Sequence, residues 1–159
     1  MGLKTQVHFL TEEPVLPVFE AVSRAAALRV FPGSEMYRLP NVVGAEAFPL
    51  DAVEAQTMSS RLLDELKPSA IITIEKCSPN TRGVYHTGRG TDMSASTAKI
   101  GLLVSEARSR GILTIGIGDL GNELGFGSIR SVVEEHIPFG RASISVDAKR
   151  SILSKICPD

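Results

Sequence analysis

Apolar residues recur along this chain in two alternating patterns, one typical of helices and one typical of buried strands. A spacing of three to four residues predicts helices at 14–28, 51–67 and 94–110, and another that spans Ile129 to Val133 and ends at Pro138. Short aliphatic and β-branched runs predict strands at 7–10, 70–74 and 112–117, with a strand-like piece at 37–43. A last strand is expected at 142–146 and a short helix at 148–156.

Cap and stop residues support the boundaries of two of these helices. Asp51, with Glu54 three positions later, forms a capping-box pattern, and Pro68 ends that helix. Ser94 or Ser96 is expected to cap the next helix, which stops at Gly111. The stretch at 78–94 has neither periodicity, so we expect a long loop, which in a compact domain is typical of a functional segment.

The order of the elements predicts the fold class. Strands and helices alternate, as they do in α/β proteins whose parallel sheet is covered by helices. We therefore expect one α/β domain over 1–159, a three-layer Rossmann-like sandwich with a mostly parallel sheet and right-handed crossovers. The run from Ile112 to Ile117 is expected to be a central strand, buried on both of its faces.

Composition and charge exclude several classes of protein. A chain of 159 residues with 43% hydrophobic residues suffices for one core, and a net charge of −1 without a basic cluster argues against a nucleic-acid partner. No apolar run approaches the ~20 residues of a membrane span, and the N-terminus does not resemble a signal peptide. Two cysteines without metal spacing favour a reducing compartment, so we expect the cytoplasm, or the mitochondrial matrix in a eukaryote.

The glycine-rich stretch after the third predicted strand carries the main functional signal. It reads GILTIGIGDLGNELGFG from Gly111 to Gly127 and sets Asp119, Asn122 and Glu123 among the glycines. Glycine permits sharp turns with exposed backbone N–H groups, and open α/β sheets bind ligands where a strand runs into such a turn. The acids there can act as acid or base, hold a metal, or only cap the next helix.

A second acidic strand end belongs to the same edge of the predicted sheet. Glu75 ends the strand at 70–74, and the carboxyl ends of parallel strands lie side by side. The loop at 78–94 adds four polar residues to this edge: Tyr85, His86, Arg89 and Asp92. Acids beside a cation suit a substrate with both an amine and a carboxylate, because an arginine can bind a carboxylate through two hydrogen bonds.

Structural interpretations of these residues stay open. Glu75 can pair with Lys76 or Arg82, and Asp92 can be a turn residue ahead of the next helix. His86 has no partner histidine at metal-binding spacing, so we expect it to be a loop residue rather than a ligand. Cys77 is expected to be a small, half-buried thiol and not a nucleophile.

Three segments of the chain resemble the D-glutamate cyclase C-terminal domain family. They are IITIEK at 71–76, the segment from Gly83 to Asp92, and GIGDLGNELG at 116–125. Members of that family carry an IERPG-like strand end, a GxYYNxRG-like loop and a GIGDGGNEIGMG-like signature. The resemblance covers roughly residues 5–140.

The resemblance implies a lyase that converts D-glutamate to 5-oxo-D-proline with loss of water. The amine attacks the γ-carboxyl carbon of the same molecule, which needs a base, neutralisation of the attacked carboxylate and an acid for the departing oxygen. It implies catalytic or metal-holding roles for Glu75, Asp92, Asp119 and Glu123. It implies substrate-binding roles for Arg89, Asn122, Tyr85, Gly118 and Gly121. The partner is then a small amino dicarboxylate. The resemblance leaves the cofactor open, but the number of carboxylates makes a divalent cation, Mg²⁺ or Mn²⁺, a candidate, with Glu75 and Asp119 as its candidate ligands.

The sequence departs from the family pattern in three places. Leu120 stands where the family usually has glycine, so the turn after Asp119 is expected to differ. The usual first strand with its glycine-rich loop, and a C-terminal SNWG-like stretch, are not recognisable, which suggests a shortened relative.

Two alternatives to an enzyme remain. One is a non-catalytic α/β module that binds a phosphate, nucleotide or amino acid, although the chain has no P-loop lysine motif and its acids would repel phosphate. The other is a truncated, inactive relative, or one completed in a homo-oligomer.

Overall fold

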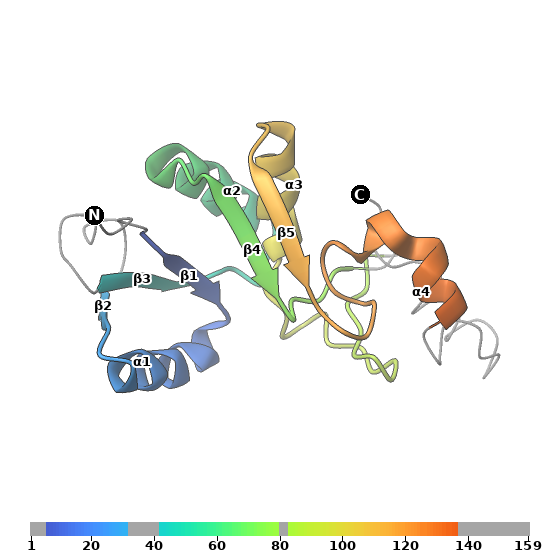
Figure 1. Ribbon diagram of the computed structural model, residues 1–159, viewed down its shortest axis with the longest axis horizontal. Helices are drawn as coiled ribbons and strands as arrows, with labels where there is room; N and C mark the ends of the chain where they lie inside the picture. The colour runs from blue at the N-terminus through green and yellow to red at the C-terminus, as the bar shows by residue number, and fades with distance from the viewer. Residues whose placement is uncertain (1–5, 32–41, 80–82, 137–159) are drawn as a thin grey trace.

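The computed structural model shows an α/β protein and describes residues 6–31, 42–79 and 83–136 (Figure 1). The elements occur in this order: β1 (His8–Thr11), the 3₁₀ turn η1 (Glu13–Val15), α1 (Leu16–Ala25), β2 (Arg29–Phe31), β3 (Val42–Ala47), α2 (Ala52–Leu66), β4 (Ala70–Ile74), α3 (Ile100–Ser109), β5 (Leu113–Ile117), the 3₁₀ turn η3 (Phe126–Ile129) and α4 (Arg130–His136). None of the described helices is long and apolar enough to cross a membrane.

The described strands form two parallel sheets rather than the single sheet expected. One has the order β1-β3-β2, with His8 opposite Gly44, and the other pairs β4 with β5, with Ile74 opposite Ile117. The carboxyl ends of β1, β4 and β5 nevertheless come together in Figure 1. An ion pair joins two of these ends, because Lys76 Nζ lies 2.6 Å from Glu12 Oε1.

The described residues up to Ala47 build the first sheet and the helix packed on it. Phe9 of β1 contacts Phe19 of α1, with ring centroids 4.2 Å apart. The sequence pattern predicted β1 and α1, but it missed β2 and placed a strand-like piece at 37–43. The strand that forms there is β3, whose small residues Gly44, Ala45 and Ala47 do not produce the usual aliphatic signal. Residues 37–41 lie outside the described residues, as do the strand expected at 142–146 and the helix expected at 148–156.

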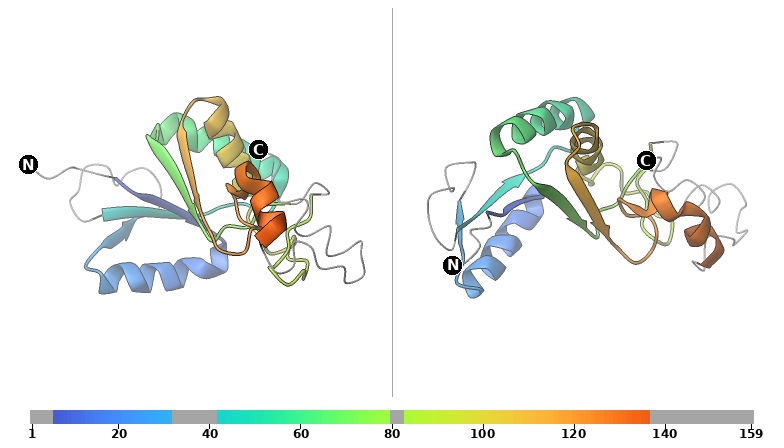
Figure 2. Two further views of the ribbon diagram at one scale, coloured as in Figure 1. Left: turned by 45° about the vertical axis from the view of Figure 1, so that its right-hand side comes forward. Right: turned by 45° about the horizontal axis from the view of Figure 1, so that its top comes forward.

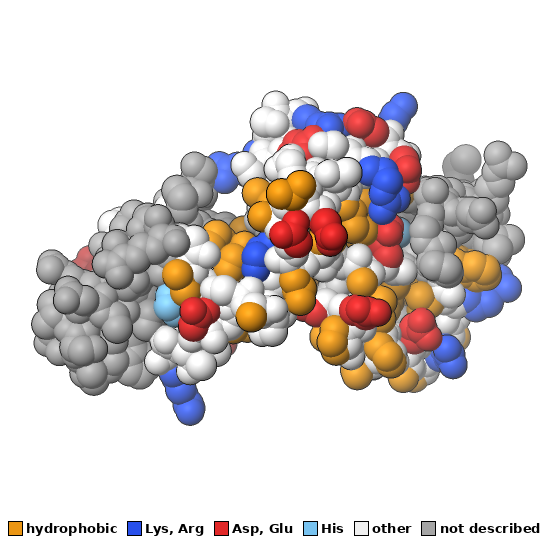
Figure 3. Space-filling model, turned by 180° about the vertical axis from the view of Figure 1, so that it is seen from behind, with side chains coloured by type: hydrophobic (Ala, Val, Ile, Leu, Met, Phe, Trp, Pro, Cys, Tyr) orange, Lys and Arg blue, Asp and Glu red, His pale blue; other side chains and the backbone are white. Residues whose placement is uncertain are grey.

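Helix α2 begins as its cap predicted. The Asp51 side chain accepts hydrogen bonds from the backbone N–H groups of Val53, at 2.8 Å, and Glu54, at 3.0 Å. The helix ends at Leu66, its C-cap Lys67 has the left-handed φ of 44°, and Pro68 follows. The side of α2 and α3 away from the sheet carries interspersed acidic and basic side chains (Figure 3), among them the ion pair of Arg110 with Asp64 at 2.6 Å.

Helix α3 begins later than expected. Its N-cap is Lys99, and neither predicted serine caps it. Ser94 Oγ instead accepts a hydrogen bond from Tyr85 N, and Ser96 Oγ donates to the Met93 carbonyl, so both hydroxyls serve the preceding loop. The predicted stop at Gly111 is confirmed, since this residue has φ +75 directly after the helix. The main core lies between α2 and α3 and joins Phe48, Ala55, Leu62, Leu63, Ala98, Ile100, Leu103, Ala107 and Leu124.

The prediction that β5 is buried on both faces is wrong. Helices α2 and α3 cover one face of the β4–β5 sheet, and no described element covers the other (Figure 2). The uncovered face carries aliphatic side chains, including Ile74, which is 62% exposed, and Ile117, which is 50% exposed. Among the described strands β5 pairs only with β4, so it forms an edge. An aliphatic run alone does not distinguish an edge strand from a central one.

Candidate functional site

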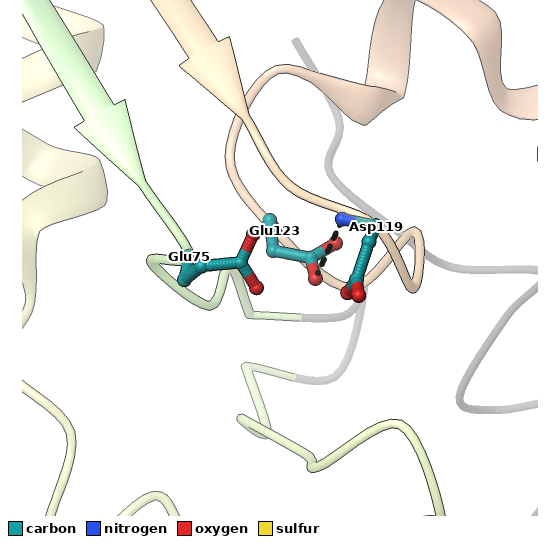
Figure 4. A group of neighbouring side chains, drawn as sticks. All are labelled: Glu75, Asp119 and Glu123. Carbon is teal, nitrogen blue, oxygen red and sulfur yellow. Dashed lines mark hydrogen bonds between the residues drawn. The ribbon is translucent and has the colours of Figure 1, made fainter.

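Three carboxylates meet where β4 and β5 end. Glu75 follows β4, Asp119 follows β5, and Glu123 lies in the turn after Asp119 (Figure 4). Each offers one carboxylate oxygen to a group whose oxygens all lie within 4.8 Å of one another. The expectation that Glu75 and Asp119 share an edge is thus met in the geometry, and Glu123 lies between them in Figure 4.

The backbone at Glu75 has a conformation that is rare for a residue with a side chain. Its φ is +53, in the left-handed region, and its N–H donates a hydrogen bond to the Ile117 carbonyl at 2.8 Å. Such a conformation costs about 1–3 kcal/mol and persists where the surrounding structure imposes it, often at functional sites. Here the pairing with the end of β5 holds the turn, and the Glu75 carboxylate extends toward Glu123 (Figure 4).

Glu123 is the buried member of the cluster. Its side chain is only 3% exposed, and its Oε1 accepts hydrogen bonds from the backbone N–H of Leu120, at 3.1 Å, and of Asp119, at 3.4 Å. Gly118 makes this position possible, because a Cβ there would lie 2.7–2.8 Å from the Glu123 side chain. Gly121, with φ +82, completes the turn.

The charges in the cluster act on one another. Desolvation, followed by the charges of Asp119 and Glu123, raises the pKa of the Glu75 carboxyl. Carboxylates this close favour uptake of a proton or a cation, which relieves their repulsion. The cluster can therefore accept a proton, bind an ammonium group, or hold a divalent cation through hard oxygen ligands.

Asn122 faces into the protein. It is 6% exposed, and its Nδ2 donates to the His86 carbonyl at 2.6 Å and contacts Cys77 Sγ at 3.4 Å. The Asn122 backbone carbonyl accepts a hydrogen bond from Ser78 N at 2.8 Å. The side chain expected to bind substrate thus connects the signature turn with the neighbouring loops. Burial, then the charge of Glu123, raises the pKa of the Cys77 thiol, in keeping with the expectation that it is no nucleophile.

The other predicted site residues lie on the loop at 83–94, outside the three-acid cluster. Tyr85 is buried, and Lys99 Nζ lies 4.4 Å from its ring centroid. Arg89 is exposed. Asp92 is exposed and accepts a hydrogen bond from Ser94 N at 2.8 Å, and its hydrogen bonds with Ser94 lower its pKa. The contacts of Asp92 therefore agree with the interpretation that it is a turn residue ahead of the next helix.

Sequence reasoning missed one strand-end acid. Glu12 directly follows β1, as Glu75 follows β4, so the same rule identifies it. Its carboxylate binds Lys76 Nζ at 2.6 Å and accepts a hydrogen bond from Ala98 N at 3.0 Å. The ion pair suggested between Glu75 and Lys76 is therefore not the one the structure shows, because Lys76 binds Glu12.

A cavity of about 640 Å³ lies between α3 and the strands. Its described lining includes Thr73, Tyr85, Ser105 and Arg108, and no member of the acidic cluster. The acidic cluster therefore lies outside this cavity.

Parallel sheets with acids gathered at the carboxyl ends of their strands define an α/β protein with its candidate site at the usual edge. The particular family follows from the sequence. The chain belongs to the D-glutamate cyclase-like, C-terminal family, whose model matches residues 2–156. This confirms the resemblance, and the match reaches beyond the 5–140 expected for it. No curated protein matches the chain.

Proposed function

We propose that this chain is a D-glutamate cyclase-like lyase that forms 5-oxo-D-proline from D-glutamate with loss of water. Membership of the family supports the reaction class. The observation that carries the proposal is the convergence of Glu75, Asp119 and Glu123 at two strand ends, beside a loop that bears an arginine.

The reaction needs a group that takes up protons and returns them. The substrate ammonium loses two protons, its nitrogen bonds to the γ-carboxyl carbon, and one γ-oxygen leaves with those protons as water. Glu75 is the proposed proton carrier, because its carboxylate is exposed at the strand end and its pKa is raised by desolvation and by its acidic neighbours. Asp119 and the buried Glu123 attract the substrate ammonium to this position.

Two further groups complete the proposed site. Arg89 binds a substrate carboxylate, for which its planar guanidinium is suited. The three carboxylates fit a divalent cation such as Mg²⁺ or Mn²⁺, because they offer hard oxygen ligands from three side chains within 4.8 Å. Such a cation would supply neutralisation of the γ-carboxylate under attack.

The direct test is chiral measurement of 5-oxoproline formed from D-glutamate by the full chain, with L-glutamate as the stereochemical control. Parallel reactions contain Mg²⁺, Mn²⁺ or a chelator. Turnover of D-glutamate supports the proposal, and its loss with the chelator assigns the acids to a metal. A folded chain that binds D-glutamate in calorimetry without converting it would overturn the lyase in favour of a binding module.

A further inference from the structure

The residue that departs from the family pattern makes a specific contact. A Cβ placed on Gly88 would lie 2.5 Å from Leu120 Cδ1 and 3.3 Å from its Cβ and Cγ. The Leu120 side chain therefore lies directly against Gly88, and a side chain at position 88 would require Leu120 or the hairpin to shift. Gly88 precedes Arg89, and Leu120 follows Asp119, so the contact brings a proposed cation and a proposed acid into one neighbourhood.

A second contact lies two residues away on each segment. Asn122 Nδ2 donates to the His86 carbonyl at 2.6 Å. Leu120 thus meets Gly88 and Asn122 meets His86, so the signature turn runs in the opposite direction to the loop and is attached to it at two points. Because Asn122 is only 6% exposed, its side chain suits a fixed attachment between the turn and the loop rather than contact with a substrate that enters from solvent.

The loop beyond these contacts is a small hairpin. Thr87 N donates to the Thr91 carbonyl at 2.9 Å, Thr91 N donates to Thr87 Oγ1 at 3.1 Å, and an antiparallel bridge pairs His86 with Asp92. Arg89 lies within this hairpin. Because the hairpin holds itself together, its contacts at 86 and 88 set where Arg89 stands.

The same turn also holds the buried acid, since Leu120 N donates to Glu123 Oε1 at 3.1 Å. We infer that Leu120 and Asn122 are positioning residues that hold the Arg89 hairpin at a fixed separation from the acidic cluster. They do so through Gly88 and His86 on one side and Glu123 on the other. The inference rests on the proposed function, in which Arg89 binds a carboxylate of the substrate whose ammonium lies at the acids.

The test is a pair of substitutions that create and then relieve a clash. Gly88→Ala sets a methyl group against Leu120 Cδ1 and displaces the hairpin, so we expect KM for D-glutamate to rise roughly tenfold with kcat changed far less. Leu120→Ala removes the clashing methyl groups and leaves a 3.3 Å approach that a small shift relieves. The double variant Gly88→Ala/Leu120→Ala should therefore return KM to that of Leu120→Ala alone.

Gly101→Ala in α3 is the matched control, because a Cβ there meets no atom closer than 3.5 Å. It should leave KM unchanged. An unchanged KM in Gly88→Ala, or a KM in the double variant that stays above that of Leu120→Ala alone, would overturn the inference.

A second readout does not depend on turnover. The amide protons of Asp119 and Leu120, both bonded to Glu123, should exchange with solvent faster in Gly88→Ala and regain protection in the double variant. Unchanged protection in Gly88→Ala would overturn the coupling even in an active enzyme. If the wild-type chain does not convert D-glutamate, the proposed function fails, and restored protection in the double variant still supports the coupling of hairpin and acid.

Discussion

Glu12 and Glu75 occupy equivalent places in the two sheets, yet their surroundings are opposite. Each directly follows a parallel strand, β1 for Glu12 and β4 for Glu75. Burial alone would raise the pKa of Glu12, but the hydrogen bonds from Lys76 and from Ala98 N outweigh it and lower the pKa below its ordinary 4.5. Desolvation and two neighbouring carboxylates raise the pKa of Glu75 above the same value.

The contrast separates a structural acid from a chemical one. The adjacent residues Glu75 and Lys76 contribute to the two sites separately. Lys76 forms the ion pair with Glu12, and Glu75 extends toward the acidic cluster. An acid that is paired with a lysine ties two strand ends together, whereas carboxylates crowded against one another favour uptake of a proton or a ligand. Four substitutions test this division, in order of expected effect.

Of the four substitutions, Asp119→Asn should have the largest effect on activity, and it should leave stability nearly unchanged. We expect kcat/KM for D-glutamate to fall by about 100-fold or more, the usual contribution of a proton-transferring or charge-bearing group. Stability should change little, because Asp119 is exposed. Steady-state kinetics and thermal melts check both, with Asp64→Asn on α2 as the control. Wild-type activity in Asp119→Asn would remove it from the site.

Arg89→Ala should raise KM for D-glutamate roughly tenfold with a smaller change in kcat, because it removes the proposed carboxylate contact. It should not alter the pH dependence of stability that Glu75 causes, since Arg89 is not among the causes of the Glu75 shift. Kinetics at fixed pH and denaturation at several pH values measure the two effects. An unchanged KM would exclude the carboxylate clamp.

Glu12→Gln should act on stability. Replacing the carboxylate weakens its hydrogen bonds with Lys76 and Ala98 N, and we expect a loss of about 1–2 kcal/mol in the free energy of unfolding at neutral pH. Because the folded pKa is lowered, the stabilisation is present above pH 4.5 and is lost as pH falls through the folded pKa. The free energies of unfolding of wild type and Glu12→Gln, measured by urea denaturation, should therefore become equal in acid. A difference that persists in acid would argue against the ion pair as its source.

Glu75→Gln should have the smallest effect on stability, and its sign should be opposite to that of Glu12→Gln. A raised folded pKa means that ionised Glu75 destabilises the fold, and this cost appears as pH rises above 4.5. The variant should therefore be slightly more stable than wild type at pH 7 and equal to it in acid, while its activity is lost. Denaturation at both pH values decides this. Lower stability at pH 7 would show that Glu75 is a structural acid like Glu12.

Local features of the chain were readable where a short-range interaction decides the structure. Asp51 caps α2 because its side chain reaches N–H groups two and three residues ahead, and Gly111 ends α3 because it adopts a positive φ. The same reasoning failed at Ser94, whose hydroxyl is taken by Tyr85 N from another part of the loop. It also failed for β5, because exposure depends on which elements cover a strand.

The sequence by itself determined the family, the α/β alternation and the rule that acids at strand ends share an edge. These follow from motif, periodicity and the parallel direction of the strands. Only the tertiary structure decided which acids meet and which are neutralised. Glu123 joins the acidic cluster because Gly118 leaves space for its side chain. Glu12 is neutralised because Lys76, at the end of the second sheet, forms an ion pair with it at the end of the first. Lys76 and Glu12 lie 64 residues apart in the chain, so no local spacing encodes their contact.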